Sequence, residues 1–150
     1  GEPDSPDWDP YGLINRLQLD ALLGNEVAVD AGLIAKCQDA ARSRFDQTGE
    51  FFDAIKPVDA SLALWLADTR SLGPDPGAEL KSLYRDAVHQ LYRSALEFDS
   101  VVTQLNLLAD FLRCRDADDP RCAVLDALAF QLGGTPAAAP PRRKAPRKPA

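Results

Sequence analysis

The sequence has no methionine, a single histidine (His89) and three cysteines in 150 residues, and it contains no long apolar run. The densest apolar stretch, residues 62–67, is far shorter than the roughly 18 residues that a membrane-spanning helix needs. Because methionine is missing even at position 1, we expect the chain to be a processed or trimmed product. Its acidic, proline-rich start (residues 1–10) does not resemble a signal peptide.

Motifs for catalysis and for cofactor binding are also missing. The sequence contains no G-x-G-x-x-G, no P-loop and no H-E-x-x-H motif. His89 has no Ser or Cys nucleophile in a recognisable motif and is interpreted as a structural side chain. The acidic loop 116–119 lacks the twelve-residue ladder of a calcium site. We therefore expect no enzymatic activity, no metal, no cofactor and no small-molecule substrate.

Charge is distributed unevenly along the chain. The formal net charge is −6, but the last nine residues hold five cations and no acid: Arg142, Arg143, Lys144, Arg147 and Lys148. Residues 1–141 therefore carry 12 basic and 23 acidic side chains, a net charge of −11. A body this acidic is poorly suited to bind nucleic acid or an anionic membrane through its folded surface. Weak polyanion contact is predicted for the tail alone.

Helical periodicity is the main positive signal. Apolar stripes with helix breakers predict helices over residues 10–23, 30–55, 58–71, 78–115 and 120–132. Gly49 lies inside the second stripe, where a kink or break is possible. The second helix is predicted to end at Lys56-Pro57, because the residue before a proline is disfavoured in the α region.

The longest stripe covers residues 78–115. Apolar or aromatic residues recur there at steps of three and four, which predicts one helix of about 55 Å. Residues 101–112 are apolar around most of the helix and are expected to form the centre of the core. Helices of these lengths predict an all-α single domain: a bundle of about five mostly antiparallel helices. Its parts would be an extended lead-in (1–10), the bundle (11–134) and a disordered Ala/Pro/Arg/Lys tail (135–150).

The cysteines allow two interpretations. Cys37 lies on the apolar stripe of the second helix and is expected to be buried. Cys114 ends the long helix and Cys122 begins the last one, so a helical hairpin could bring them within disulfide distance. A disulfide would indicate a periplasmic or extracellular protein, whereas free thiols are typical of the cytoplasm. A zinc site lacks the usual short cysteine spacing.

These features leave three hypotheses about function. The first is a non-enzymatic protein–protein interaction module: an adaptor, a scaffold or a coiled-coil oligomerisation domain. Its basis is that the apolar stripe of the long helix is longer than the helices available to cover it. Its candidate partner surface is Leu83, Tyr84, Leu91 and Tyr92, and the expected partner is another protein or a second copy of the chain. The alternative is a secreted or periplasmic helical factor (an inhibitor, immunity-type or toxin-associated protein) with a Cys114–Cys122 disulfide. The third is weak polyanion or nucleic-acid binding through the tail, which could also fold back on the acidic body.

Overall fold

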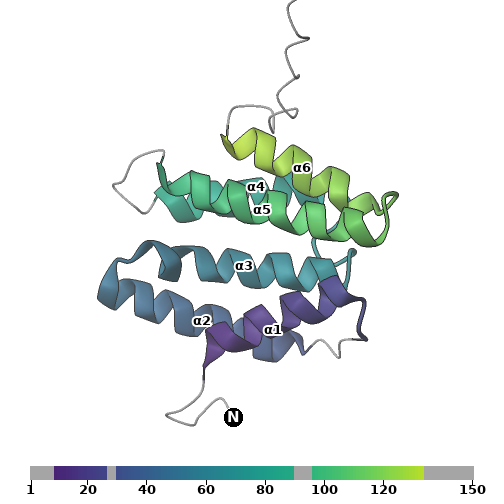
Figure 1. Ribbon diagram of the computed structural model, residues 1–150. Coiled ribbons are helices and arrows are strands. Elements are labelled where there is room, and N and C mark those ends of the chain that lie inside the picture. Colours follow the sequence, from purple (N-terminus) through teal and green to yellow (C-terminus); the bar gives the residue numbers. More distant parts are fainter. Residues whose placement is uncertain (1–8, 27–29, 90–95, 134–150) are drawn as a thin grey trace, which may run out of the picture.

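The computed structural model describes residues 9–26, 30–89 and 96–133, and these ranges form six α-helices without a strand (Figure 1). The helices are α1 (Pro10–Leu23), α2 (Ala31–Thr48), α3 (Phe51–Ala67), α4 (Pro76–His89), α5 (Leu96–Arg115) and α6 (Pro120–Gly133). The prediction of an all-α single domain is confirmed. None of the helices in these ranges combines the length and the apolar character that crossing a membrane requires.

The ends of α1 and α2 are set by aspartates at their starts and glycines after their ends. The Asp30 carboxylate accepts the first backbone N–H groups of α2, and Asp9 does the same for α1. Gly24 and Gly49 follow the two helices in the left-handed conformation, with φ of 73° and 61°. Glycine adopts this conformation without the steric cost that a Cβ adds. The chain therefore breaks at Gly49, one of the two outcomes expected there, and the predicted single helix over residues 30–55 is wrong.

A proline lies inside α3, so the predicted helix end at Lys56-Pro57 and the separate helix 58–71 are wrong. Pro57 is the seventh residue of α3, where its missing N–H removes one hydrogen bond to the Asp53 carbonyl. Ten of the 17 residues of α3 are buried. We attribute the continuation of the helix to this packing, which offsets the lost hydrogen bond.

The predicted single helix over residues 78–115 is also wrong. It is replaced by α4 and α5, which run antiparallel in Figure 1, while residues 90–95 between them lie outside the described ranges. Both helices face the same buried cluster. A straight helix of 38 residues would extend past its neighbours, whereas folding back buries both halves of the stripe within one domain.

The helix α3 lies in the middle of the molecule. In Figure 1, α1 and α2 pack on one side of it and α4, α5 and α6 on the other. Side chains near the start of α1 contact the start of α3: the Tyr11 hydroxyl donates to Asp53, and Lys56 Nζ donates to Asn15 Oδ1 at 3.5 Å. The two helices therefore run parallel, whereas helices that follow one another in the chain run antiparallel.

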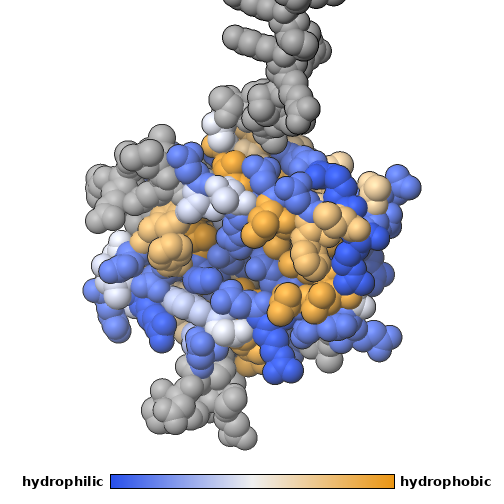
Figure 2. Space-filling model, in the orientation of Figure 1, coloured by the Kyte–Doolittle hydropathy of each residue, from blue (hydrophilic) through white to orange (hydrophobic). Residues whose placement is uncertain are grey.

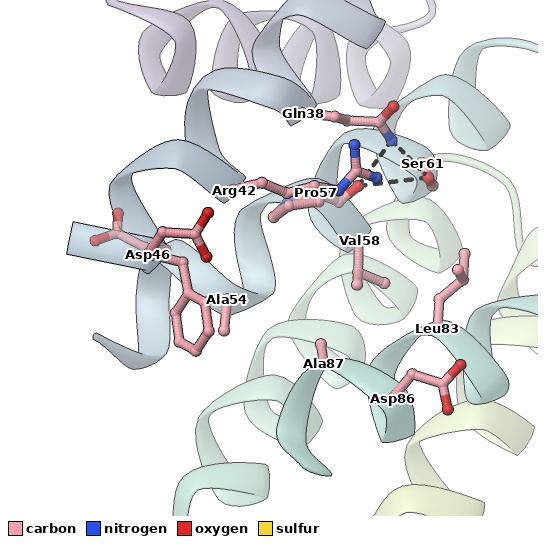
Figure 3. Close-up of a pocket in the computed structure, with 12 residues that line it drawn as sticks. Gln38, Arg42, Asp46, Ala54, Pro57, Val58, Ser61, Leu83, Asp86 and Ala87 are labelled. Atoms are coloured by element: carbon pink, nitrogen blue, oxygen red, sulfur yellow. Dashed lines mark hydrogen bonds between the residues drawn. The ribbon is translucent and has the colours of Figure 1, made fainter. Parts of the chain in front are cut away.

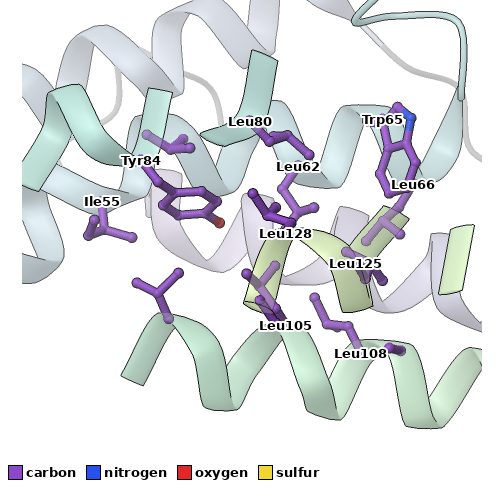
Figure 4. Close-up of a cluster of buried hydrophobic side chains, with 14 of the residues drawn as sticks. Ile55, Leu62, Trp65, Leu66, Leu80, Tyr84, Leu105, Leu108, Leu125 and Leu128 are labelled. Atoms are coloured by element: carbon purple, nitrogen blue, oxygen red, sulfur yellow. The ribbon is translucent and has the colours of Figure 1, made fainter. Parts of the chain in front are cut away.

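Two buried clusters meet on α3. The larger one joins α3 to α4, α5, α6 and the end of α1, and Figure 4 shows part of it, including Leu62, Trp65, Tyr84, Leu105, Leu125 and Leu128. The smaller one joins α3 to α1 and α2 and consists of Ile14, Leu17, Ile34, Cys37, Ala60 and Ala63. The predicted burial of Cys37 is confirmed, since its exposed fraction is 0%.

Two arginines from the C-terminal half bind the ends of N-terminal helices. Arg115 Nη1, at the end of α5, donates to the Leu22 carbonyl of α1 at 3.0 Å. Arg121 Nη1, in the first turn of α6, donates to the Leu66 carbonyl of α3 at 2.8 Å. Carbonyls in the last turn of a helix lack an intrahelical donor, so each arginine satisfies a group that would otherwise need water.

Candidate protein interface

One face of α5 is apolar and exposed. Val101, Leu105, Leu108 and Leu112 point into the core, but Leu107 is 68% exposed and Phe111 is 39% exposed. The expectation that residues 101–112 are packed on several sides is therefore correct for one side of the helix and wrong for the other.

This exposed side also lacks charge. Residues 100–109 contain no Asp, Glu, Lys or Arg, so the outward residues of α5 between Asp99 and Asp110 are neutral. Solvated helix faces usually carry charged side chains, and the centres of protein–protein interfaces are depleted of them. The composition of this face is therefore typical of a contact surface.

The end of α1 extends this surface. Leu19 and Leu23, one turn apart on α1, are 52% and 41% exposed. Arg115, at the end of α5, reaches the Leu22 carbonyl and so places the ends of the two helices next to each other. Figure 2 shows apolar surface over the right-hand half of α5 and the adjoining end of α1. We call Leu19, Leu23, Leu107 and Phe111 the α1–α5 face.

A second surface feature is a cleft above α3. It has a volume of about 330 Å³ and lies between α2 and α4 (Figure 3). Its floor is formed by Ala54, Pro57, Val58 and Ser61, which recur at the spacing of one helix face of α3. These residues are small, so the cleft is open to solvent rather than filled. We call it the α2–α4 cleft.

The walls of the α2–α4 cleft come from the two flanking helices. Phe45 and Asp46 of α2 line the cleft on one side of the floor, and Leu83 and Asp86 of α4 line it on the other. Gln38 fixes the upper rim, because its Nε2 donates to the Pro57 carbonyl and to Ser61 Oγ, both at 3.0 Å. The cleft therefore has an apolar floor and an acidic rim.

Two buried aspartates on α3 bond to tyrosines from opposite sides. Asp59 Oδ1 accepts the Tyr84 hydroxyl at 2.9 Å, and Lys56 Nζ lies 3.9 Å from Asp59 Oδ2. Burial raises the pKa of Asp59 to about 6, against the opposing effects of Lys56 and of the Tyr84 hydrogen bond. Burial is also the main cause that raises the pKa of Tyr84 well above its usual value. The pair is enclosed within the core, which indicates a structural role.

The second pair lies at the edge of the molecule. Asp53 accepts the Tyr11 hydroxyl and also the Thr48 hydroxyl, the latter at 2.6 Å. Burial and then the bond to Asp53 raise the pKa of Tyr11 to about 12. Cations approach the Tyr11 ring, with Arg44 Cζ at 4.9 Å and Lys56 Nζ at 5.6 Å from its centroid. This arrangement attaches α1 to the start of α3.

The structure does not assemble the predicted partner surface. Tyr84 has an exposed fraction of 0% and belongs to the core, so its assignment to a partner surface is wrong. Its hydroxyl finds a buried partner in Asp59, which the helical period could not reveal. Leu83 is half-buried in the wall of the α2–α4 cleft. Leu91 and Tyr92 lie outside the described residues.

All three cysteines are free thiols. Cys114 is exposed on α5, whereas Cys122 is buried and its Sγ lies 3.5 Å from the Ala109 carbonyl. Burial is the main cause that raises the pKa of Cys122. The structure therefore contains the hairpin that was expected, but it does not contain the Cys114–Cys122 bond.

The remaining predicted sites have separate outcomes. The basic residues Arg142, Arg143, Lys144, Arg147 and Lys148 lie outside the described residues. His89 is exposed at the end of α4. Within the described ranges, no group of three or more His, Cys, Asp or Glu side chains is placed to hold a metal ion.

Sequence reasoning missed the α1–α5 face. The signal that could have identified it is the absence of charge over residues 100–109.

Comparison with known proteins gives no relative: no protein-family model, curated protein or solved structure matches this chain.

Proposed function

We propose that this protein is a non-enzymatic helical interaction module that associates with a second copy of itself through the α1–α5 face. The observation that carries the proposal is the exposure of Leu107 within ten consecutive uncharged residues of α5 (100–109). Exposed apolar surface of this kind is favourable to bury, and Phe111, Leu19 and Leu23 extend it across two helices.

The charge of the body supports a second copy as the partner. Residues 1–141 carry a net charge of −11, so two copies repel each other when charged faces approach. A two-fold symmetric contact places the same patch of both copies against itself, and like charges would then meet. A neutral apolar patch avoids this penalty. The centre of the α1–α5 face is such a patch, because it is both apolar and uncharged.

The experiment is light scattering coupled to size exclusion on the full chain and on two variants. Leu107→Asp places a charge at the centre of the face. Phe52→Asp is the control, because Phe52 is 64% exposed and lies at the start of α3, the opposite end of the molecule from Leu23. We expect a dimer for the unchanged chain and for Phe52→Asp, and a monomer for Leu107→Asp.

Two results would count against the proposal. A monomer for the unchanged chain up to high micromolar concentration would overturn self-association. A dimer that survives Leu107→Asp would show that a different surface is used. Circular dichroism of each variant separates loss of association from loss of fold.

A further inference from the structure

The α2–α4 cleft carries negative charge that the described residues leave uncompensated. Asp46 and Asp86 stand on its two walls, and neither has an ion-pair partner within the described ranges. The cation at the rim, Arg42, is paired instead with Asp39, with Nη1 at 3.1 Å from Oδ1. The cleft therefore favours an occupant that is cationic and has an apolar stem.

The most basic segment of the sequence begins within reach of this cleft. α6 ends at Gly133, where an added Cβ would lie 3.4 Å from Val102 of α5. Asp86 lies in the last turn of α4, and the antiparallel arrangement places that turn at the same end of the molecule as the first turns of α5. Eight residues separate Gly133 from Arg142. They can span up to about 26 Å, compared with about 20 Å between the axes of the two outer helices when three helices pack side by side.

We propose that the α2–α4 cleft binds residues 142–148 of the same chain. Arginine and lysine bury their alkyl stems on apolar surface while their charged ends stay in water. Here the stems would lie over Val58 and Leu83, and the charged ends would meet Asp46 and Asp86. Tethering raises the effective concentration of the segment to the millimolar range, so exposed ion pairs that are weak between separate molecules can hold it. This contact does not involve the α1–α5 face. It adds to the proposed function a second binding site, which the chain's own tail occupies.

Trypsin tests the proposal on the full chain, because it cleaves after the same Arg and Lys residues that would be bound. The test variant is Asp46→Asn with Asp86→Asn. The control is Glu79→Gln with Asp118→Asn, which changes the net charge equally but alters exposed acids at the opposite end of the molecule. At low salt we expect the tail of the test variant to be cleaved about threefold faster, or more, than that of the unchanged chain. The control should match the unchanged chain, and high salt should remove the difference.

Equal cleavage rates in the test variant and the unchanged chain would overturn the proposal, as would equal acceleration in the control. Protection that increases with protein concentration would place the tail of a second copy in the cleft and would overturn the assignment to the same chain. Self-association through the α1–α5 face is measured separately by light scattering, so either proposal can fail without affecting the test of the other.

Discussion

On one side of α3, the helices α4, α5 and α6 share a buried cluster of twenty described residues with it and with the end of α1, whereas on the other side α1 and α2 share a cluster of six. The larger cluster contains Trp65 and Tyr84, and half of the smaller one consists of Cys37, Ala60 and Ala63. Hydrophobic stabilisation scales with the apolar area removed from water. The difference indicates that α1 and α2 form the less stable side and open first in local unfolding.

The two tyrosine–aspartate pairs repeat this contrast. Tyr84 and Asp59 are enclosed between α3 and α4, while Tyr11 and Asp53 lie at an edge where Thr48 provides a second donor. Losing a hydrogen bond costs more where water cannot replace it. We therefore expect the Tyr84–Asp59 hydrogen bond to stabilise its side of α3 more than the Tyr11–Asp53 hydrogen bond stabilises the other side.

The largest predicted effect on stability comes from two matched Leu→Ala substitutions, one in each buried cluster. Leu62→Ala in the larger cluster should lower the free energy of unfolding by about 4 kcal/mol, because Leu62 is completely buried. Leu17→Ala in the smaller cluster should cost less and reduce hydrogen-exchange protection mainly in α1 and α2. Urea denaturation measures the free energy of unfolding of each variant, and amide hydrogen exchange measures the protection of each helix. Equal loss of protection across all helices in Leu17→Ala would contradict the division into a stable and a less stable side.

The next effect is a dependence of stability on pH. The pKa of Asp59 is raised from 3.8 to about 6 in the folded protein, so the folded state binds this proton more tightly than the unfolded state. Its contribution to stability is complete below about pH 4 and is lost as the pH rises through 6, a change of about 3 kcal/mol. Asp59→Asn should remove this slope between pH 4 and 6 in denaturation experiments. An unchanged slope would show that other groups cause it.

The smallest effect distinguishes the two tyrosines. Tyr84→Phe should cost about 2 kcal/mol, because it removes the hydroxyl bonded to a buried carboxylate, and Tyr11→Phe about 1 kcal/mol, because Asp53 keeps the Thr48 hydroxyl. Tyr84→Phe should also raise the pKa of Asp59 further, since the lost hydrogen bond lowers it. Thermal unfolding at pH 7 measures the first effect and carboxyl titration by NMR the second. A larger cost for Tyr11→Phe would reverse the comparison.

Local signals were sufficient for part of the fold. Gly24, Asp30 and Gly49 act through their own conformations and short-range hydrogen bonds, so the sequence alone places the end of α1 and the start of α2 and marks Gly49 as the point of a kink or break. Pro57 could not be placed in this way, because α3 continues through it only when the surrounding helices bury ten of its residues. Burial of that kind is a tertiary effect that no single segment contains.

The candidate interface shows a related limit. Periodicity identifies which residues share a side of a helix, but it does not state whether that side meets the core or solvent. Leu105 and Leu107 are equally apolar, and their exposed fractions are 0% and 68%. The division into α4 and α5 could not be predicted for the same reason, because two antiparallel helices that face the same core can have the same apolar spacing as one continuous helix.

The contacts of Arg115 and Arg121 have a consequence for the order in which the protein folds during synthesis. The carbonyls that they bind, at Leu22 and Leu66, leave the ribosome 93 and 55 residues earlier. Until the turn between α5 and α6 has emerged, the C-terminal ends of α1 and α3 lack these donors. The ends of these N-terminal helices thus gain their donors only late in synthesis, and until then the growing protein depends on solvent to hydrate them.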